Sequence, residues 1–439
     1  FMKTEEGLKR EIGTVGLTAN IINLVVGSGI FVLPAMVSEG LGSAGILAYL
    51  FCGFLITLIM LCFAEAGSKI TVTGGAYTYI ERAFGKYFGF LTTNLLIFGT
   101  SLMATAAVAN ALVDTLAYLM PIFHDTYFRV GFLILIFTGL TVVNVVGVKQ
   151  GITLVKFTTI AKLSPLILLV LWGVTRIVPS NLSWQSSPAV NDVAKVSLLL
   201  FFAFQGAESS LSVGGEVRNP RKTVPKAILF GFLVILLLYI SIQLVSQGIL
   251  GNSFSSYTDA PLAEVAKRVM GPFGVTLMIL GAAISMFGYL SGDTLNMPRV
   301  LFRTAKDRII PIKSLAKVHP KFATPYVAVI AYTVLGCFFA ITGEFKQLAI
   351  LSSSSVLLVY MGVALSVLKL RLHEKPNQKT FRIPGGFIVP ILAVVTILWF
   401  LSSLTWQEIV GILIALAILS LIYFLLRLFK LNTGNSSNI

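Results

Sequence analysis

The sequence is poor in charged residues, histidine and cysteine, and each shortage excludes a class of protein. Only 12% of its 439 residues are charged, whereas soluble domains carry about 25%. Cys52, Cys62 and Cys337 form neither a CxxC motif nor a Cys/His cluster, so the sequence predicts neither a disulfide framework nor a metal site. No nucleophile arrangement or nucleotide-binding motif is present, so we expect neither an enzyme nor a cofactor.

What the chain has instead is apolar sequence, which makes up 56% of it. A bilayer core about 30 Å thick needs roughly 20 apolar residues in a helix. We therefore predict an all-α membrane protein with twelve spans, at residues 14–37, 44–68, 87–113, 129–147, 151–175, 195–216, 225–249, 273–305, 325–342, 347–369, 386–402 and 408–428.

The formal net charge of +15 follows from where the basic residues lie between these spans. With both termini on one side, that side's loops and span ends hold 25 of the 33 Lys and Arg residues, and the other side holds five. Cytoplasmic loops carry this excess, so both termini are predicted to be cytoplasmic in a multi-pass protein of the cell membrane. The charge is thus a topology signal, and no nucleic-acid partner is expected.

The first apolar segment contains Gly27-Ser28-Gly29 near mid-depth. Glycine is a poor helix former, and backbone groups freed in a membrane must face protein or a water-filled cavity. One interpretation is a broken helix, whose two half-helix ends hold a carboxylate and an ammonium or cation. The other is a close-packed surface of small residues.

The sixth span has a similar interruption, from Phe202 through Gln205, Gly206 and Glu208 to Ser210. Two interruptions, each at the start of a five-span half, indicate an inverted repeat and favour the broken-helix interpretation of the first span. The predicted division is a cytoplasmic segment (1–13), a first repeat (14–177), a second repeat (192–372), two additional helices (384–429) and a cytoplasmic tail (430–439).

Three ionisable residues lie deep within predicted spans: Lys162, Glu208 and Asp293. Such residues are costly in a membrane unless they are paired, and they mark functional sites. Glu208 relays a proton or holds the broken helix. Asp293 either partners a base such as Lys162 or binds an ammonium or a proton.

Two further features carry open alternatives. In the third span, Asn94, Ser101 and Thr105 share one helix face, which indicates either a polar lining or hydrogen bonds between helices. Residues 252–261 form a polar outer loop, followed by an expected short helix to Met270. This segment is an external lid or a linker.

Several short motifs occur in order along the chain: Val26 to Phe31, Ala64-Glu65, Gly74 to Tyr77, Phe204 to Glu208, Asn219-Pro220 with Pro225, Pro298-Arg299, and Phe381 to Pro384. Their order resembles that of the amino acid–polyamine–organocation transporter superfamily over nearly the whole chain. Thr158-Thr159-Ile160-Ala161-Lys162 is similar to its L-amino-acid-transporter-like branch.

The resemblance implies a LeuT-type fold with five-plus-five inverted repeats, broken first and sixth helices, two peripheral helices, and alternating access. It also implies that Val26, Gly27, Ser28 and Gly29 meet the substrate carboxylate, and that carbonyls around Phe202, Ala203, Phe204 and Gln205 meet its ammonium. Lys162 would occupy the region of sodium in sodium-driven relatives. Phe202 stands where arginine/agmatine exchangers carry a gating tryptophan, so it is the expected gate.

The expected function is therefore sodium-independent transport or exchange of L-amino acids, with small or neutral substrates. The partners are the amino acid and the lipid bilayer, with proton coupling and oligomeric state left open. One alternative is a proton-coupled transporter of cationic amino acids or polyamines. Another, from a different class, is a membrane amino acid sensor or channel.

Overall fold

The computed structural model describes residues 13–70, 75–146, 152–184, 187–208, 217–306, 310, 312–322, 324–373 and 381–434, with the backbone alone for 152–159, 220–221 and 426–434. Within them the chain is helical and contains no strand. The α-helices are α1 (Thr14–Val25), α2 (Gly29–Leu41), α3 (Ile46–Lys69), α4 (Ala76–Phe84), α5 (Lys86–Asn94), α6 (Met103–Ala117), α7 (Thr126–Val146), α8 (Ile152–Gly173), α9 (Val190–Leu200), α11 (Pro220–Leu250), α12 (Pro261–Lys306), α13 (Tyr326–Thr342), α14 (Phe345–His373), α15 (Ile388–Leu401) and α16 (Trp406–Gly434).

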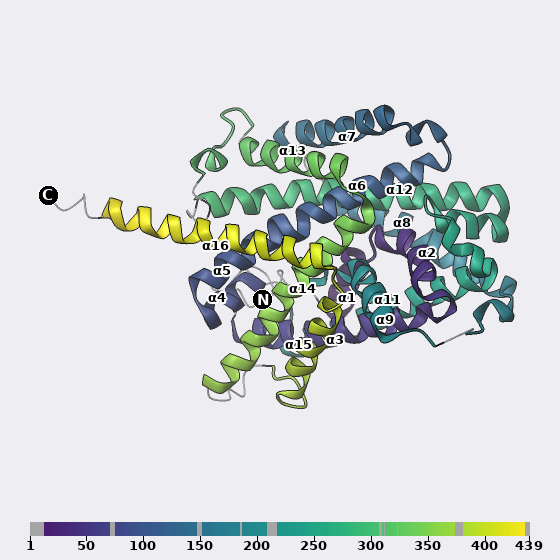
Figure 1. Ribbon diagram of the computed structural model, residues 1–439, viewed down its shortest axis with the longest axis horizontal. Helices are drawn as coiled ribbons and strands as arrows, with labels where there is room; N and C mark the ends of the chain where they lie inside the picture. Colours follow the sequence, from purple (N-terminus) through teal and green to yellow (C-terminus); the bar gives the residue numbers. More distant parts are fainter. Residues whose placement is uncertain are drawn as a thin grey trace.

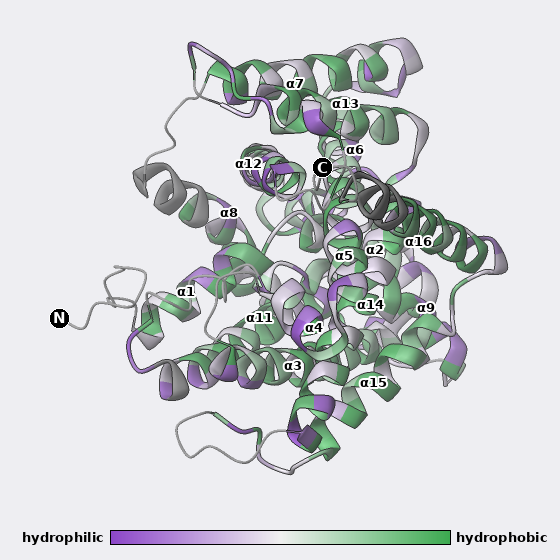
Figure 2. Ribbon diagram, turned by 90° about the vertical axis from the view of Figure 1, so that its left-hand side faces the viewer, coloured by the Kyte–Doolittle hydropathy of each residue, from purple (hydrophilic) through white to green (hydrophobic). Residues whose placement is uncertain are grey.

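Seven helical stretches of this part of the chain are long and apolar enough to cross a membrane. Three shorter apolar helices, α1, α13 and α15, accompany them. Hydrophobic residues, drawn in green, recur along the helices in Figure 2. The all-α membrane class is confirmed, whereas the count of twelve spans stays a prediction.

Two groups of helices, α7 with α13 and α11 with α2 and α3, are each held together by their own hydrogen bonds. In both views α7 and α13 lie together on one side of the molecule, and α3 and α15 lie on the opposite side (Figures 1 and 2). Thr141 of α7 donates to Thr333 of α13 at 2.7 Å. In the other group, the hydroxyls of Ser38 on α2 and Tyr49 on α3 donate to two glutamines of α11, at 2.7 and 3.1 Å.

A buried ion pair joins α3, α14 and the segment before α15. The Nε of Arg371 donates to Glu65 at 2.7 Å, and a second guanidinium nitrogen bonds the other carboxylate oxygen. The backbone N–H of Ile383 donates to the same carboxylate at 2.9 Å, and Arg371 also donates to the carbonyl of Gly386. Because both charged side chains are at most 1% exposed, this network fixes one end of the helix bundle.

Two local irregularities interrupt the helices outside the breaks described below. Gly271, at φ +66°, divides α12 into a short helix and a long one, which confirms the expected short helix ending at Met270. Between α5 and α6 the chain forms a π-helix, η2 (Leu95–Leu102). π-helical turns frequently occur at functional sites, and η2 packs against α14.

Candidate functional site

The first apolar segment is broken where its glycines lie. α1 ends at Val25 and α2 begins at Gly29, and no side chain caps the N-terminus of α2 in the described structure. Val26 and Ser28 are nearly fully buried. The predicted break is therefore present, and it leaves the first N–H groups of α2 facing the interior, where the positive end of the helix dipole favours an anion.

The second break begins after α9. The chain tightens into a short 3₁₀ helix, η6 (Phe201–Phe204), and becomes extended at Gln205. Gly206 follows with φ +103°, a conformation that glycine adopts without strain. This confirms an interruption at the predicted position. Ser209 and Ser210, which belong to the same predicted stretch, lie outside the described residues.

The two breaks touch each other. A Cβ atom built on Gly29 would lie 2.8 Å from the Cβ of Ala203, and one built on Gly206 would lie 2.8 Å from the carbonyl oxygen of Leu24. Glycine is therefore required at both positions, because the two segments lie too close together for a side chain to fit between them. The structure brings the predicted residues Gly29 and Ala203 together from positions far apart in the sequence.

Tyr239 of α11 links the breaks, and sequence reasoning missed it. Its hydroxyl lies 3.3 Å from the carbonyl oxygen of Val25 and 3.1 Å from that of Ala203. The side chain is fully buried. A signal was present, because Tyr239, Gln243 and Gln247 are spaced by four residues and so form one polar stripe in an apolar helix.

Gln205 is fixed by serines of α14. Its side-chain nitrogen donates to Ser353 at 3.0 Å, and Ser352 donates to its oxygen at 3.1 Å. The hydroxyl of Ser352 also lies 3.0 Å from the carbonyl oxygen of Thr100 in η2. The second break is thus joined through α14 to the π-helix.

Lys162 meets the end of α1. Its ammonium donates to the carbonyl oxygen of Asn23 in the last turn of that helix, and the residue is only 8% exposed. A cation at a helix C-terminus is stabilised by the negative end of the dipole. The adjacent Thr158 and Thr159 have no described side chains.

Asp293 is not paired with Lys162 in the described structure, so that alternative is wrong. The carboxylate of Asp293 accepts hydrogen bonds from Ser101, Thr105 and Tyr332. Ser101 and Thr105 therefore make bonds between helices, while Asn94 donates to a carbonyl of its own helix at 2.8 Å. Glu208 is held separately, by the N–H of Gly206 at 3.0 Å and by the hydroxyl of Tyr360.

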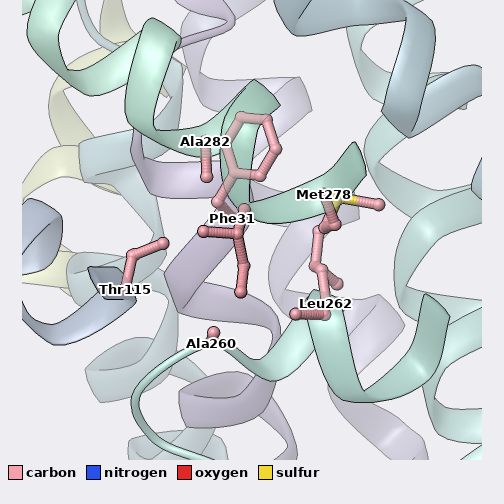
Figure 3. A pocket seen from close by; sticks show the side chains of 8 residues that line it. Phe31, Thr115, Ala260, Leu262, Met278 and Ala282 are labelled. Atoms are coloured by element: carbon pink, nitrogen blue, oxygen red, sulfur yellow. The ribbon is translucent and has the colours of Figure 1, made fainter. Parts of the chain in front are cut away.

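Apolar side chains close one end of the site. Phe31 of α2 packs between α6 and both parts of α12, beside a small hollow (Figure 3). Phe202 contacts the ring of Phe345 edge-on, with centroids 5.7 Å apart, and is 8% exposed. The residues that line the hollow are Phe31, Thr115, Ala260, Leu262, Ala263, Met278, Ile279 and Ala282. The segment before Gly271 therefore packs beside Phe31, and its role as an external lid or a linker stays a prediction.

Replacing Gly206 by alanine is expected to remove most transport activity. The left-handed backbone conformation would cost about 1–3 kcal/mol with a Cβ atom, and that atom would also collide with the carbonyl oxygen of Leu24. Substrate flux and thermal unfolding of the purified variant would measure the effect. Gly139→Ala is the matched control, because a Cβ atom there meets nothing within 4 Å. Wild-type flux in Gly206→Ala would show that the two breaks separate freely.

Comparison with known proteins decides the family. A family model described as amino acid permease matches residues 12–426, which is most of the chain. The chain belongs to the amino acid permease family. This match confirms the predicted superfamily. Members of the family are transporters rather than enzymes, and the chain is a multi-pass membrane protein.

Relatives of this permease carry amino acids according to their names. The serine/threonine exchanger SteT of Bacillus subtilis is 29% identical over 92% of this chain and 93% of its own length. The branched-chain amino acid permease BcaP of the same organism is 26% identical over 96% and 94%. The mouse b(0,+)-type amino acid transporter 1 is 24% identical over 96% and 89%. Amino acid transport is therefore the activity of this permease.

Proposed function

We propose that this permease is a sodium-independent exchanger or transporter of small or neutral L-amino acids. The observation that carries the proposal is the junction of the two breaks, where Gly29 lies against Ala203 and Gly206 lies against Leu24. There the substrate carboxylate meets the N–H groups at Gly27, Ser28 and Gly29. The ammonium meets carbonyls around Phe202 to Gln205.

Lys162 supports sodium independence. Its ammonium already supplies the positive charge at the C-terminal end of α1, where exposed carbonyls would otherwise bind a cation. Because the Lys162 ammonium is part of the chain, no sodium ion is needed at this position.

The acidic residues support neutral substrates over cationic ones. A distal ammonium would need a free carboxylate, but the described oxygens of Asp293 accept three hydroxyl hydrogen bonds. Glu208 is engaged by Gly206 and Tyr360. Transport of cationic amino acids or polyamines is therefore the weaker candidate.

Movement between the two helix groups provides alternating access. Each group is held by its own hydrogen bonds. The contacts between α2 and α12 around Phe31, by contrast, are apolar. Apolar contacts part without leaving unpaired polar groups. We propose a LeuT-type arrangement of twelve spans with both termini in the cytoplasm, in which opening at Phe31 and Phe202 admits substrate from outside.

Uptake into proteoliposomes tests this proposal. We expect unlabelled amino acid inside the vesicles to accelerate the entry of labelled serine or leucine, and sodium to have no effect. Internal lysine, ornithine and putrescine are expected to be poor exchange partners. Preferential uptake of the basic substrates, or a requirement for sodium, would replace the proposal with the cationic or the sodium-driven alternative.

A further inference from the structure

The hydroxyl cage around Asp293 contains four short oxygen–oxygen contacts. Ser101 lies 2.6 Å from Oδ1, while Thr105 and Tyr332 lie 2.6 and 2.5 Å from Oδ2. The fourth contact joins the hydroxyls of Ser101 and Tyr332 at 2.8 Å. All four lie in the range of O–H···O hydrogen bonds, and each such bond needs one hydrogen.

Three hydroxyls cannot supply four hydrogens. Ser101, Thr105 and Tyr332 each bring one, and an ionised carboxylate brings none. The cage is therefore one hydrogen short as long as Asp293 is ionised, and a proton on the carboxyl group completes it.

We propose that Asp293 binds and releases the proton that couples transport to pH. This deepens the proposed amino acid transport and rests on it for the coupling, though not for the binding of the proton itself. A proton from the aqueous phase adds to Oδ1 and is donated to Ser101. The hydrogen of Ser101 then turns to Tyr332, and no other bond is made or broken.

Glu208 is less suited to this exchange because one of its partners cannot reverse. The backbone N–H of Gly206 is only a donor, so it stabilises the ionised carboxylate more than the neutral acid. The partners of Asp293 are all hydroxyls, which donate to the ionised form and accept from the neutral one. The Asp293 cage therefore serves both protonation states.

The surroundings contribute few other titratable groups. Tyr332 of α13 and Tyr289 of α12 face the carboxylate, and the adjoining parts of η2 and α6 provide only Ser101 and Thr105. α8 contributes Lys162, which is bonded to Asn23. Asn144 of α7 donates to Thr294 of α12, Phe31 of α2 packs beside both parts of α12, and Lys313 of η9 (Lys313–Ala316) is exposed. No cation forms an ion pair with Asp293 in the described part of the chain.

The cage is also connected to the second break. Ser101 directly follows Thr100, whose carbonyl lies near the hydroxyl of Ser352, and Ser352 donates to Gln205. A change at Ser101 is therefore transmitted through η2 and α14 to the segment that contacts substrate. This gives the proton a physical route to the substrate site.

Infrared difference spectroscopy of the purified protein tests proton binding without any transport. We expect a pH-dependent C=O band of a protonated carboxylic acid in the wild type. The component of this band that is lost in Asp293→Asn should persist in Glu208→Gln, because the other Asp and Glu residues contribute the remainder. The asparagine amide supplies N–H hydrogens to the cage, so the variant is expected to fold. Absence of that component in the wild type, or its loss in Glu208→Gln, overturns the proposal.

Transport in proteoliposomes tests the coupling. A one-unit inward proton gradient can drive at most about tenfold accumulation with one proton per substrate. We expect Asp293→Asn to lose this accumulation entirely while homoexchange persists, and Glu208→Gln to keep responding to the gradient. Retained accumulation in Asp293→Asn overturns the coupling.

If Asp293→Asn does not fold, Glu208→Gln still decides, since loss of the gradient response there assigns the proton to Glu208. Infrared bands as expected, with no flux of any amino acid, would refute the proposed function but leave the proton site standing.

Discussion

Replacing Lys162 by alanine is expected to abolish or strongly slow amino acid uptake while the protein still folds. The substitution leaves the carbonyl of Asn23 without the ammonium and removes the only positive charge that the structure places at the C-terminal end of α1 among the described residues. A charge at a partly buried helix end contributes up to about 2 kcal/mol, roughly a thirtyfold change in an equilibrium. Homoexchange in proteoliposomes measures the loss, and thermal unfolding checks the fold.

Lys195→Ala is the matched control for this prediction. Lys195 also lies in an apolar helix, α9, but it is exposed, so its removal should leave exchange unchanged. Lys162→Met tests charge against packing, because methionine restores much of the lysine side-chain volume. Wild-type uptake in Lys162→Ala would remove this lysine from the mechanism.

Arg371→Met is expected to destabilise the folded protein strongly. Breaking a buried ion pair by removing one partner costs about 3–5 kcal/mol, because the other charge stays buried without compensation. Glu65 would be that charge, with only Ile383 and Lys69 still near its oxygens among the residues that the structure describes. The expected results are a large fall in the unfolding temperature and poor recovery from the membrane.

A double variant separates the charge from the packing. Glu65→Leu combined with Arg371→Met removes both charges, so it should recover part of the lost stability. The carbonyl of Gly386 would still lack its donor, which limits the recovery. A double variant as unstable as Arg371→Met alone would show that the contacts to the segment before α15, rather than the ion pair, provide the stability.

Sequence is sufficient for features that depend on one segment at a time. Gly27 and Gly29 weaken a helix because glycine propagates helices poorly, and the similar interruption of the sixth span favours a break there. Its predicted depth in the membrane is enough to mark Lys162, since a lysine far from both membrane surfaces needs a partner. The partner itself, the carbonyl of Asn23, cannot be read from sequence.

Features that depend on the rotation of one helix against another are beyond sequence reasoning. Hydropathy does not determine which face of α12 meets α6 or α13, so it does not predict the cage around Asp293. For the same reason hydropathy leaves Asp293 and Lys162 open as partners, although they face different helices. Tyr239 is missed because its role exists only where two breaks meet.

The π-helix η2 has an evolutionary consequence for the permease family. A π-turn closes its hydrogen bond one residue later than an α-turn, so η2 behaves as an insertion absorbed within a continuous helix. A homologue with one residue fewer between Asn94 and Met103 can form an ordinary α-helix there and still present its equivalent of Thr105 to α12. Alignments of the family should therefore admit a single-residue gap within this span, although gaps are normally confined to loops.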